Sequence, residues 1–366
     1  MKLALIGLAN SGRTTILNAL AGLALETQPY PNTEGEPHRA MVKVPDARID
    51  ELARIYSPKK TTCATVEYAD FMGLIKGDAA QNRRVFEFFK DADALVHVVR
   101  AFPDEGVLHP LETGDPRRDF TAVEEELILA YLELVEKRLE RMEEGRKKGK
   151  PPDEGERRIL LRCKEILDAE QPLRHTVFTA EELKATAHLQ FVSAKPLLPV
   201  VNVAEEDLGG ARREAWERAF AERLARYPEH NRPTALFLSA KIEMEIAQLP
   251  PEEAAAFLAD LGIAESARVA LIRASYALLG LISFLTAGED ECRAWTIPRG
   301  LSAQKAAGKV HSDIERGFIR AETVSYEDFM RHGGDMNKVK AAGAARLEGK
   351  TYIVRDGDII NFKFNV

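Results

Sequence analysis

The chain has 366 residues, 45% of them hydrophobic and 30% charged, a composition typical of soluble globular proteins. Its length suggests two or three domains, and its formal net charge of −7 argues against a protein that coats nucleic acid. Three cysteines without a Cys-x-x-Cys pair argue against a disulfide framework or a clustered zinc site. No stretch is long and apolar enough to span a membrane, and polar residues interrupt the apolar start where a secretory signal needs a continuous core. We therefore expect a cytoplasmic protein with no membrane partner.

The first residues have the pattern that opens a nucleotide-binding α/β fold. An aliphatic run over 2–6 predicts a buried parallel strand, a loop bounded by glycines follows over 7–12, and helical spacing predicts a helix over 13–21. Further strands, separated by helical patterns, are predicted at 65–70, 94–99, 197–201 and 234–238. This alternation predicts the α/β class, with a mostly parallel sheet and helices on both faces.

A purely helical stretch interrupts this alternation between about 121 and 171. Apolar residues three and four apart predict one long helix, a Gly-, Lys- and Pro-rich turn follows over 145–155, and a second helix is predicted over about 156–169. We expect an antiparallel helical hairpin inserted into the α/β domain. The Lys/Arg run at its turn is either a solvent-exposed charged turn, which we favour, or a nucleic-acid contact.

The last part of the chain changes character again. After a helix at 251–261, an apolar stretch predicts a long helix over about 266–285. Beyond Gly288, a helix over 302–311 lies among strand-like segments at 293–297, 320–324, 352–354 and 359–364, which suggests a small α+β module. We therefore expect a discontinuous α/β domain (1–120 and 172–285), the inserted hairpin (121–171) and a C-terminal domain (286–366).

The loop Gly7-Leu-Ala-Asn-Ser-Gly12-Arg13-Thr14 fits the phosphate-loop template G-x-x-x-x-G-K-[ST] at every fixed position except the lysine. Its glycines let backbone N–H groups turn toward phosphate oxygens at a helix N-terminus, whose dipole favours negative charge. Arg13 keeps the positive charge of the lysine but not its compact shape, so it either reaches the phosphates from the side or blocks them. The alternative is a glycine turn with no ligand. The residues expected to bind phosphate are Gly7, Asn10, Ser11, Gly12, Arg13, Thr14 and Thr15, with Thr14 also a Mg²⁺ ligand.

Two further segments would complete the phosphate site. Asp70-Phe-Met-Gly73 ends a predicted strand and fits D-x-x-G, in which Asp70 would hold a magnesium-bound water and the Gly73 N–H would sense the γ-phosphate. Thr33 could close over Mg²⁺ as a switch residue, although an ordinary turn threonine is nearly as plausible.

The base-binding segments favour adenine. Asn202-Val203-Ala-Glu205 follows the fourth strand, where GTPases carry N-K-x-D, but Glu205 is one methylene longer than the aspartate and Val203 replaces the lysine. The guanine clamp is therefore lost, whereas Asn202 can still donate to N7 and accept from a 6-amino group. After the fifth strand, a loop expected to contact the base is formed by Ser239, Ala240 and Lys241. The expected ligand is ATP or ADP with Mg²⁺ rather than GTP.

Together these segments resemble the Obg-like ATPase family, also called YchF, within the phosphate-loop TRAFAC GTPase superfamily. The resemblance spans essentially the whole chain and includes Ala194-Lys-Pro196, Arg273-Ala-Ser-Tyr276, Arg293-Ala-Trp295-Thr296, Gly317-Phe-Ile-Arg-Ala-Glu322, Tyr326-Glu-Asp-Phe329, Asp356-Gly-Asp358 and Phe364-Asn-Val366. It implies a G domain, an inserted helical hairpin and a C-terminal ubiquitin-like β-grasp domain of the TGS type. It also implies ATP preference, slow hydrolysis and association with ribosomes and translation or stress responses. The family replaces the water-orienting glutamine after D-x-x-G by an apolar residue, which Leu74 matches.

Departures from the family pattern concentrate in the phosphate-handling parts. Arg13 replaces the family lysine, and residues 78–84 lack the glycines of the family's mobile loop. The sequence thus indicates a divergent paralogue that binds nucleotide weakly and hydrolyses it poorly or not at all. The rival hypothesis is a non-enzymatic adaptor that binds a ribosome or RNA–protein complex, without sequence-specific DNA recognition. Eight basic residues of the C-terminal module either form a surface for RNA phosphates or are scattered solvated charges: Lys305, Lys309, Arg316, Arg320, Lys338, Lys340, Arg346 and Lys350.

Overall fold

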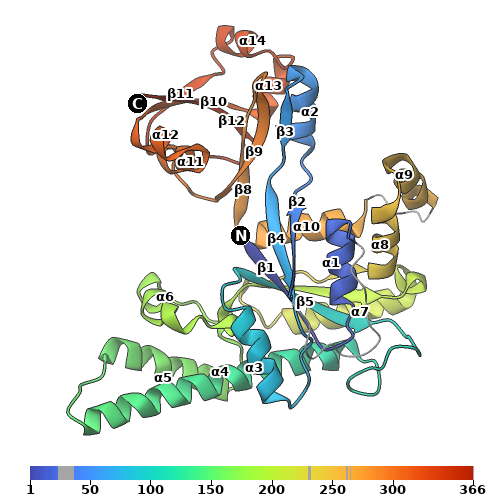
Figure 1. Ribbon diagram of the computed structural model, residues 1–366, viewed down its shortest axis with the longest axis vertical. Coiled ribbons are helices and arrows are strands. Elements are labelled where there is room, and N and C mark those ends of the chain that lie inside the picture. The colour runs from blue at the N-terminus through green and yellow to red at the C-terminus, as the bar shows by residue number, and fades with distance from the viewer. Residues whose placement is uncertain (24–36, 230–231, 261–262, 264, 366) are drawn as a thin grey trace. The chain divides into compact units, whose positions relative to one another are not determined.

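The computed structural model describes residues 1–23, 37–229, 232–260, 263 and 265–365 (Figure 1). These residues form two compact units. The first unit comprises Met1–Ala40 and Glu67–Leu271, and the second comprises Met41–Val66 and the chain from Ile272 onward. Within the described residues, no helix has both the length and the apolar character needed to cross a membrane.

A six-stranded sheet with the order β2-β4-β1-β5-β6-β7 forms the centre of the first unit. Strands β4, β1, β5, β6 and β7 pair in parallel, and Leu3 of β1 lies between Tyr68 and Ala94. Every residue of β1, β5 and β6 is buried, because helices cover the sheet, and this explains their continuous apolar sequences. The strands are β1 (Lys2–Ile6), β2 (His38–Lys43), β4 (Thr65–Asp70), β5 (Ala94–Ala101), β6 (Leu197–Val203) and β7 (Leu236–Leu238). The predicted mostly parallel α/β sheet is confirmed.

The helices of the first unit pack on this sheet and on one another. Phe86, Phe120, Leu127 and Phe220, from three helices, join the strand side chains in one hydrophobic cluster. The helices are α1 (Arg13–Ala21), α3 (Ala79–Phe88), α6 (Ala180–Thr186), α7 (Gly210–Leu224), α8 (Ala240–Gln248), α9 (Pro251–Asp260) and the first part of α10 (Ala267–Leu278).

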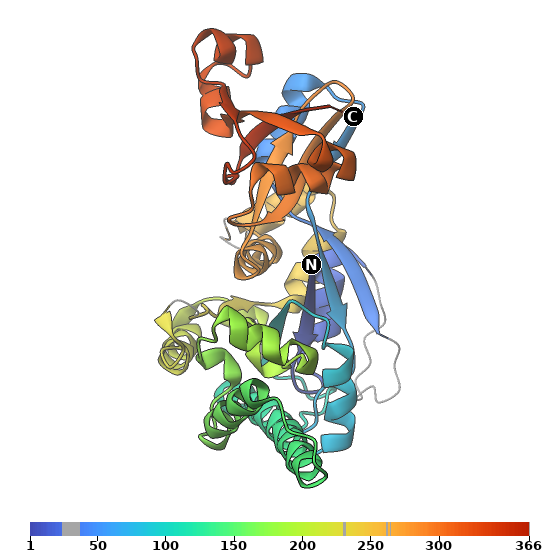
Figure 2. The ribbon, with the colours of Figure 1, turned by 90° about the vertical axis from the view of Figure 1, so that its left-hand side faces the viewer.

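Two long helices, α4 (Pro116–Lys147) and α5 (Glu154–Asp168), form the predicted antiparallel hairpin (Figures 1 and 2). The first helix begins five residues before the predicted start, because the Asp115 side chain caps its free N–H groups and Pro116 occupies its first turn. At the base of the hairpin, Arg174 forms a buried ion pair with Glu124 of α4. This pair fixes the hairpin to the segment that leads back to β6.

The second unit is a mixed sheet with the order β11-β10-β12-β8-β9-β3. Strands β8 and β12 are parallel neighbours, whereas β8–β9, β10–β11 and β10–β12 are antiparallel, and this arrangement is the expected β-grasp. The alanines of α11 (Ala303–Val310) pack closely on Phe284, Phe318 and Phe362 of the sheet. The other elements are α2 (Ala47–Tyr56), β3 (Lys60–Thr62), β8 (Leu281–Thr286), β9 (Glu291–Pro298), α12 (Ser312–Arg316), β10 (Phe318–Ser325), α13 (Tyr326–Arg331), α14 (Met336–Ala341), β11 (Arg346–Glu348) and β12 (Asp358–Phe364).

The structure differs from four expectations for the elements and their grouping into domains. The helix predicted to 285 ends at Leu278, since Gly280 adopts a left-handed φ of +61° and residues 281–286 form β8. The C-terminal unit therefore begins before 286. Residues 41–66, assigned above to the α/β domain, belong to the second unit, where β3 pairs with β9. Residues 352–354 form only a single bridge, between Ile353 and Ser302.

Candidate functional site

The phosphate loop joins the end of β1 to the start of α1. A Cβ atom at Gly12, whose φ is +91°, would lie 2.2 Å from the Asn202 side-chain nitrogen, and one at Gly7 would lie 2.4 Å from the Val98 carbonyl oxygen. Only glycine fits either position without displacing its neighbours. The loop therefore has the tight backbone course, leading into a helix N-terminus, that phosphate binding requires.

The Arg13 side chain is buried beneath this loop. Its guanidinium donates to the carbonyl oxygens of Gly7 (3.0 Å), Met72 (3.2 Å) and Phe71 (3.2 Å). Its Nε also lies 3.3 Å from Asp70 Oδ1. Burial lowers the pKa of the Arg13 guanidinium, and the Asp70 carboxylate opposes this shift. The positive charge thus joins the phosphate loop to the D-x-x-G segment and is already surrounded by protein acceptors.

Thr14 and Asp70, the two predicted Mg²⁺ ligands within the described residues, contact each other directly. The Thr14 hydroxyl donates to Asp70 Oδ2 at 2.6 Å, and the other carboxylate oxygen is buried and has no hydrogen bond from any residue that the structure describes. A hydroxyl and a carboxylate are hard oxygen donors, which suit Mg²⁺. Within the described part of the chain, no cluster of three or more His, Cys, Asp or Glu side chains could hold a metal. Thr33, the third predicted metal ligand, lies outside the described residues.

The end of the D-x-x-G segment pairs with the phosphate loop through its backbone. Leu74 N–H donates to the Gly7 carbonyl and Ala9 N–H donates to the Leu74 carbonyl, both at 3.0 Å. Gly73 packs so closely on Ala9 that a Cβ there would lie 2.5 Å from the Ala9 Cα. The Leu74 side chain is fully buried in the hydrophobic core. Leu74 therefore offers no polar group to a water molecule.

Asn202 joins the phosphate loop to the predicted base-binding loop. Its Nδ2 donates to the Ser11 carbonyl (3.1 Å), and its Oδ1 accepts from Ala240 N–H (2.9 Å). These contacts were not expected, because Asn202 was predicted to pair directly with adenine. Only the second Nδ2 hydrogen and the second Oδ1 lone pair remain for such pairing. Val203 is buried in the core, so its side chain does not line the site, whereas Glu205 and Lys241 are exposed. Ser239 is buried next to Ala240 at the start of α8.

The segment after β5 supplies residues that our sequence analysis missed. Asn10 Nδ2 donates to the Leu108 carbonyl (2.9 Å), and the Arg100 guanidinium donates to the carbonyls of Phe102, Asp104 and Val107. Arg100 is therefore a structural anchor that holds this loop beside the phosphate loop. Its buried place in an apolar strand carried no motif that could have indicated this role.

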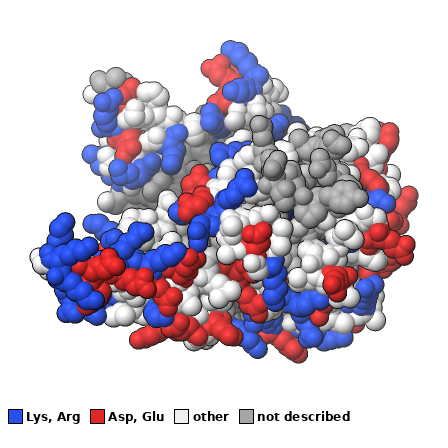
Figure 3. Space-filling model, turned by 60° about the horizontal axis from the view of Figure 1, so that its bottom comes forward, with Lys and Arg blue, Asp and Glu red and all other residues white. Residues whose placement is uncertain are grey.

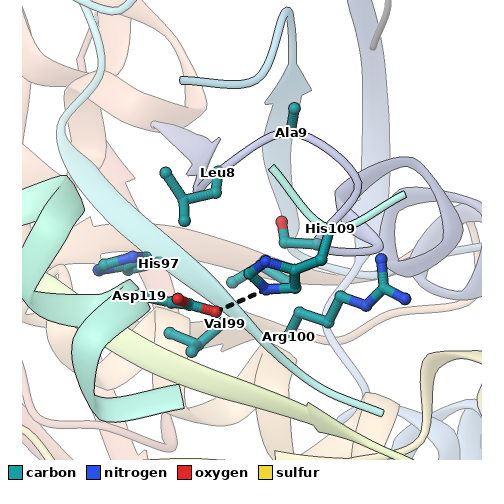
Figure 4. A pocket seen from close by; sticks show the side chains of 9 residues that line it. Leu8, Ala9, His97, Val99, Arg100, His109 and Asp119 are labelled. Carbon is teal, nitrogen blue, oxygen red and sulfur yellow. Dashed lines mark hydrogen bonds and ion pairs between the residues drawn. The ribbon is translucent and has the colours of Figure 1, made fainter. Parts of the chain in front are cut away.

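Two histidines of this region line a small cavity behind the phosphate loop (Figure 4). His109 Nδ1 accepts from Leu111 N–H, so Nε2 carries the hydrogen and donates to Asp119 at 2.8 Å. His97 stacks on Phe120, and burial, with a smaller effect of Arg174, lowers its pKa to about 3. Its Nδ1 and the Ser11 hydroxyl are buried polar atoms without a hydrogen-bond partner among the described residues. The cavity of about 10 Å³ has room for about one water molecule between such groups.

Comparisons with known proteins cover the whole chain. A family model for a 50S ribosome-binding GTPase matches residues 2–142, and one for the C-terminal part of YchF GTPases, described as a protein of unknown function, matches 281–365. The chain is 40% identical to the ribosome-binding ATPase YchF of Bacillus subtilis, covering 99% of this chain and 98% of that protein. It is 34% identical to Obg-like ATPase 1 of Oryza sativa subsp. japonica, covering 100% of this chain and 92% of that protein.

A solved structure gives the same result. The YchF GTPase of Schizosaccharomyces pombe superposes with a TM-score of 0.78 at 28% identity and covers 99% of this chain and 97% of that one. With the two family models and the full-length relatives, this match identifies both the G domain and the C-terminal module. The chain belongs to the YchF family of Obg-like ATPases.

Proposed function

We propose that this protein binds ATP or ADP with Mg²⁺ and hydrolyses ATP slowly, as a ribosome-associated switch in the cytoplasm. The observation that carries the proposal is the position of Asn202, which ties the phosphate loop to the loop at Ser239–Lys241 while Thr14 contacts Asp70. These contacts join the segments proposed to bind the phosphates, the metal and the base in one framework. Relatives that are named ribosome-binding ATPases support both the nucleotide and the ribosome as partners.

Each part of the framework has a distinct chemical task. Backbone N–H groups of residues 10–15 would bind the phosphates at the N-terminus of α1, and Gly73 N–H would bind the γ-phosphate. Thr14 and Asp70 would hold Mg²⁺, which neutralises charge on the phosphate oxygens. Leu74 is apolar and buried, so its side chain cannot orient the attacking water, and this supports slow hydrolysis.

The base preference rests on the residues around Asn202. In the GTPase motif N-K-x-D, the aspartate accepts two hydrogen bonds from guanine and the lysine covers the base. In this chain the aspartate is replaced by the exposed Glu205 and the lysine by the buried Val203. Asn202 keeps one donor and one acceptor, the pair that the N7 and 6-amino group of adenine require. We therefore propose ATP over GTP.

A non-enzymatic adaptor is the second candidate, and Arg13 favours it. Its guanidinium already serves three carbonyl oxygens and Asp70, so phosphate must compete with these acceptors. Isothermal titration with Mg-ATP, Mg-GTP and metal-free ATP tests nucleotide binding, and single-turnover release of labelled phosphate tests hydrolysis. Tight Mg-ATP binding with phosphate release that Asp70→Asn abolishes supports the switch. Absence of binding in all three titrations leaves the adaptor.

Ribosome association is testable through the basic residues of the C-terminal unit. Four of the eight are paired with carboxylates: Lys305 with Glu315, Arg316 with Asp313, Lys340 with Glu322 and Arg346 with Glu348. Figure 3 brings forward the side of the molecule that carries the hairpin, and on that face acidic and basic side chains are interspersed. The other four, Lys309, Arg320, Lys338 and Lys350, are all exposed and are therefore the better candidates for phosphate contacts.

The test is co-sedimentation of the full chain with ribosomes at two salt concentrations. The triple variant Lys309→Gln, Lys338→Gln, Lys350→Gln should bind less and depend less on salt, since each lost phosphate contact lowers the salt slope by about 0.7–0.9. Lys305→Gln is the matched control, because the Lys305 ammonium is already paired with a Glu315 oxygen at 2.6 Å. Equal sedimentation of the triple variant would assign the contact to another surface.

A further inference from the structure

A buried carboxylate on the hairpin helix α4 has no task in the proposed site. Glu126 is 7% exposed, and its two oxygens accept from Gly77 N–H and Asn82 Nδ2, each at 2.7 Å. Within the ranges that the structure describes, no lysine or arginine forms an ion pair with it. A buried charge that is satisfied only by neutral donors is costly to maintain, which points to a specific role for the contacts it makes.

Both donors belong to the segment that follows the D-x-x-G glycine. The Asn82 side chain accepts from Ile75 N–H (3.0 Å) and donates to the Ile75 carbonyl (2.8 Å), so it holds both backbone groups of that residue. Gln81, one residue earlier, donates to the Gly73 carbonyl at 2.8 Å. Residues 73–77 are therefore held by α3 and, through Glu126, by the hairpin helix.

The phosphate loop holds the same segment at its other end. Leu74 exchanges two backbone hydrogen bonds with Gly7 and Ala9, and Gly73 packs against Ala9. Only two residues separate Leu74 from Gly77, which donates to Glu126. Because the intervening Ile75 is also fixed at both backbone groups, a shift at Gly73 cannot be absorbed without changing the contacts of Glu126.

We propose that Glu126 is a positioning residue that couples the γ-phosphate-sensing segment to the helical hairpin. The inference rests on the proposed nucleotide binding and adds a direction of communication. ATP, but not ADP, would act on Gly73 and so change the hold of Gly77 and Asn82 on α4. Such coupling is reciprocal. If ATP changes the affinity of the hairpin for a macromolecule by a given factor, that macromolecule changes the affinity for ATP by the same factor.

Glu126→Gln is the sharpest substitution. It keeps the size of the side chain but turns an NH₂ group toward either Gly77 N–H or Asn82 Nδ2, so that one donor faces another donor. Glu136→Gln is the matched control, because Glu136 is an exposed residue of the same helix whose ion pair, with Lys164 of α5 at 2.6 Å, does not involve residues 73–77. Titration with Mg-ADP and with a Mg-bound non-hydrolysable ATP analogue gives two dissociation constants for each protein.

We expect Glu126→Gln to keep the ADP dissociation constant within about twofold and to change the ratio of ADP to ATP-analogue constants fivefold or more. Glu136→Gln should leave the ratio unchanged. An unchanged ratio in Glu126→Gln, or equal changes for both nucleotides, overturns the coupling while the proposed function stands. Failure of the unaltered chain to bind either nucleotide rejects the proposed function itself and the coupling that rests on it.

Hydrogen–deuterium exchange of the unaltered chain provides a second measurement that does not require a folded variant. With the ATP analogue, compared with Mg-ADP, amide exchange should change at Gly77 and in α4 around Glu126, although neither belongs to the phosphate loop. Identical exchange at these positions in the two nucleotide states would refute the coupling.

Discussion

Arg13→Lys tests the meaning of the arginine in the phosphate loop. The guanidinium uses two nitrogens to reach three carbonyl oxygens at 3.0–3.2 Å and lies beside the Asp70 carboxylate. A lysine ammonium is a compact charge on a flexible stem and cannot span the same set of acceptors. We expect it to keep a contact near Gly7 and to release the carbonyls of Phe71 and Met72.

Two opposite effects follow from this geometry. Hydrogen bonds to charged groups contribute about 1.5–3 kcal/mol, so the nucleotide-free variant should lose about that much free energy of unfolding. For a unit of this size, the midpoint of thermal unfolding should fall by roughly 3–12 °C. Mg-ATP binding should instead strengthen by about 1–2 kcal/mol, or roughly five- to thirtyfold, because the ammonium has fewer protein acceptors and can also contact phosphate.

Isothermal titration and calorimetric unfolding, each with and without Mg-ATP, measure both effects on the same preparation. Arg13→Met is the control, since it keeps an apolar stem without the charge and should weaken Mg-ATP binding. An unchanged or larger dissociation constant for Arg13→Lys would refute the view that arginine impairs the site. It would identify Arg13 as the adapted phosphate ligand. An unchanged midpoint would show that the three carbonyl contacts contribute little.

Three further predictions concern the base, the buried histidine and the hairpin. Unlabelled GTP should displace a fluorescent ATP analogue only at higher concentrations than ATP does, and displacement at equal or lower concentration contradicts the adenine preference. Because burial lowers the pKa of His97 to about 3, the unfolded chain binds a proton below about pH 6.5 that the folded protein excludes, so stability falls as the pH drops from about 7 toward 3. In urea unfolding between pH 7 and 5, His97→Gln should reduce the change of the unfolding free energy with pH by up to about 1.4 kcal/mol per pH unit. An unchanged pH dependence would show that His97 is not the group responsible. Glu124→Gln should cost about 3–5 kcal/mol because it leaves the Arg174 guanidinium buried without its carboxylate, and an unfolding midpoint equal to that of Glu125→Gln would contradict this.

Local chemistry made the phosphate loop predictable from the sequence. The bounds of β1, α1 and β4 follow from an aliphatic run, a glycine loop and the aspartate that ends a strand, all of which act over a few residues. Sequence reasoning could not distinguish a buried strand from a helix over 281–285, because an apolar run fits both. The glycine at 280, with its left-handed φ, marks the boundary.

The contacts that organise the site join residues far apart in the chain. Asn202 was identified by its motif, but its two partners, the Ser11 carbonyl and Ala240 N–H, lie 191 and 38 residues away. Glu126 and Asn82 are separated by 44 residues and match no motif, so only the packing of α4 on the segment after Gly73 reveals their relation. Motifs thus predict which polar side chains form the site, whereas the contacts that join them depend on tertiary packing.

Residues 41–66 determine how the two units can be separated experimentally. Lys60, Thr61 and Thr62 pair with β9, Arg48 bridges to Asp356, and the Tyr56 ring stacks on Phe329. A chain cut after Gly280 would therefore retain β3 and α2 without the strands and side chains that cover them. If such a fragment lost ribosome or nucleotide binding, the uncovered segment 41–66 could be the cause as readily as the missing C-terminal module. Charge and hydrogen-bond substitutions in the full chain avoid the problem, because they leave all the strands and helices of both units in place.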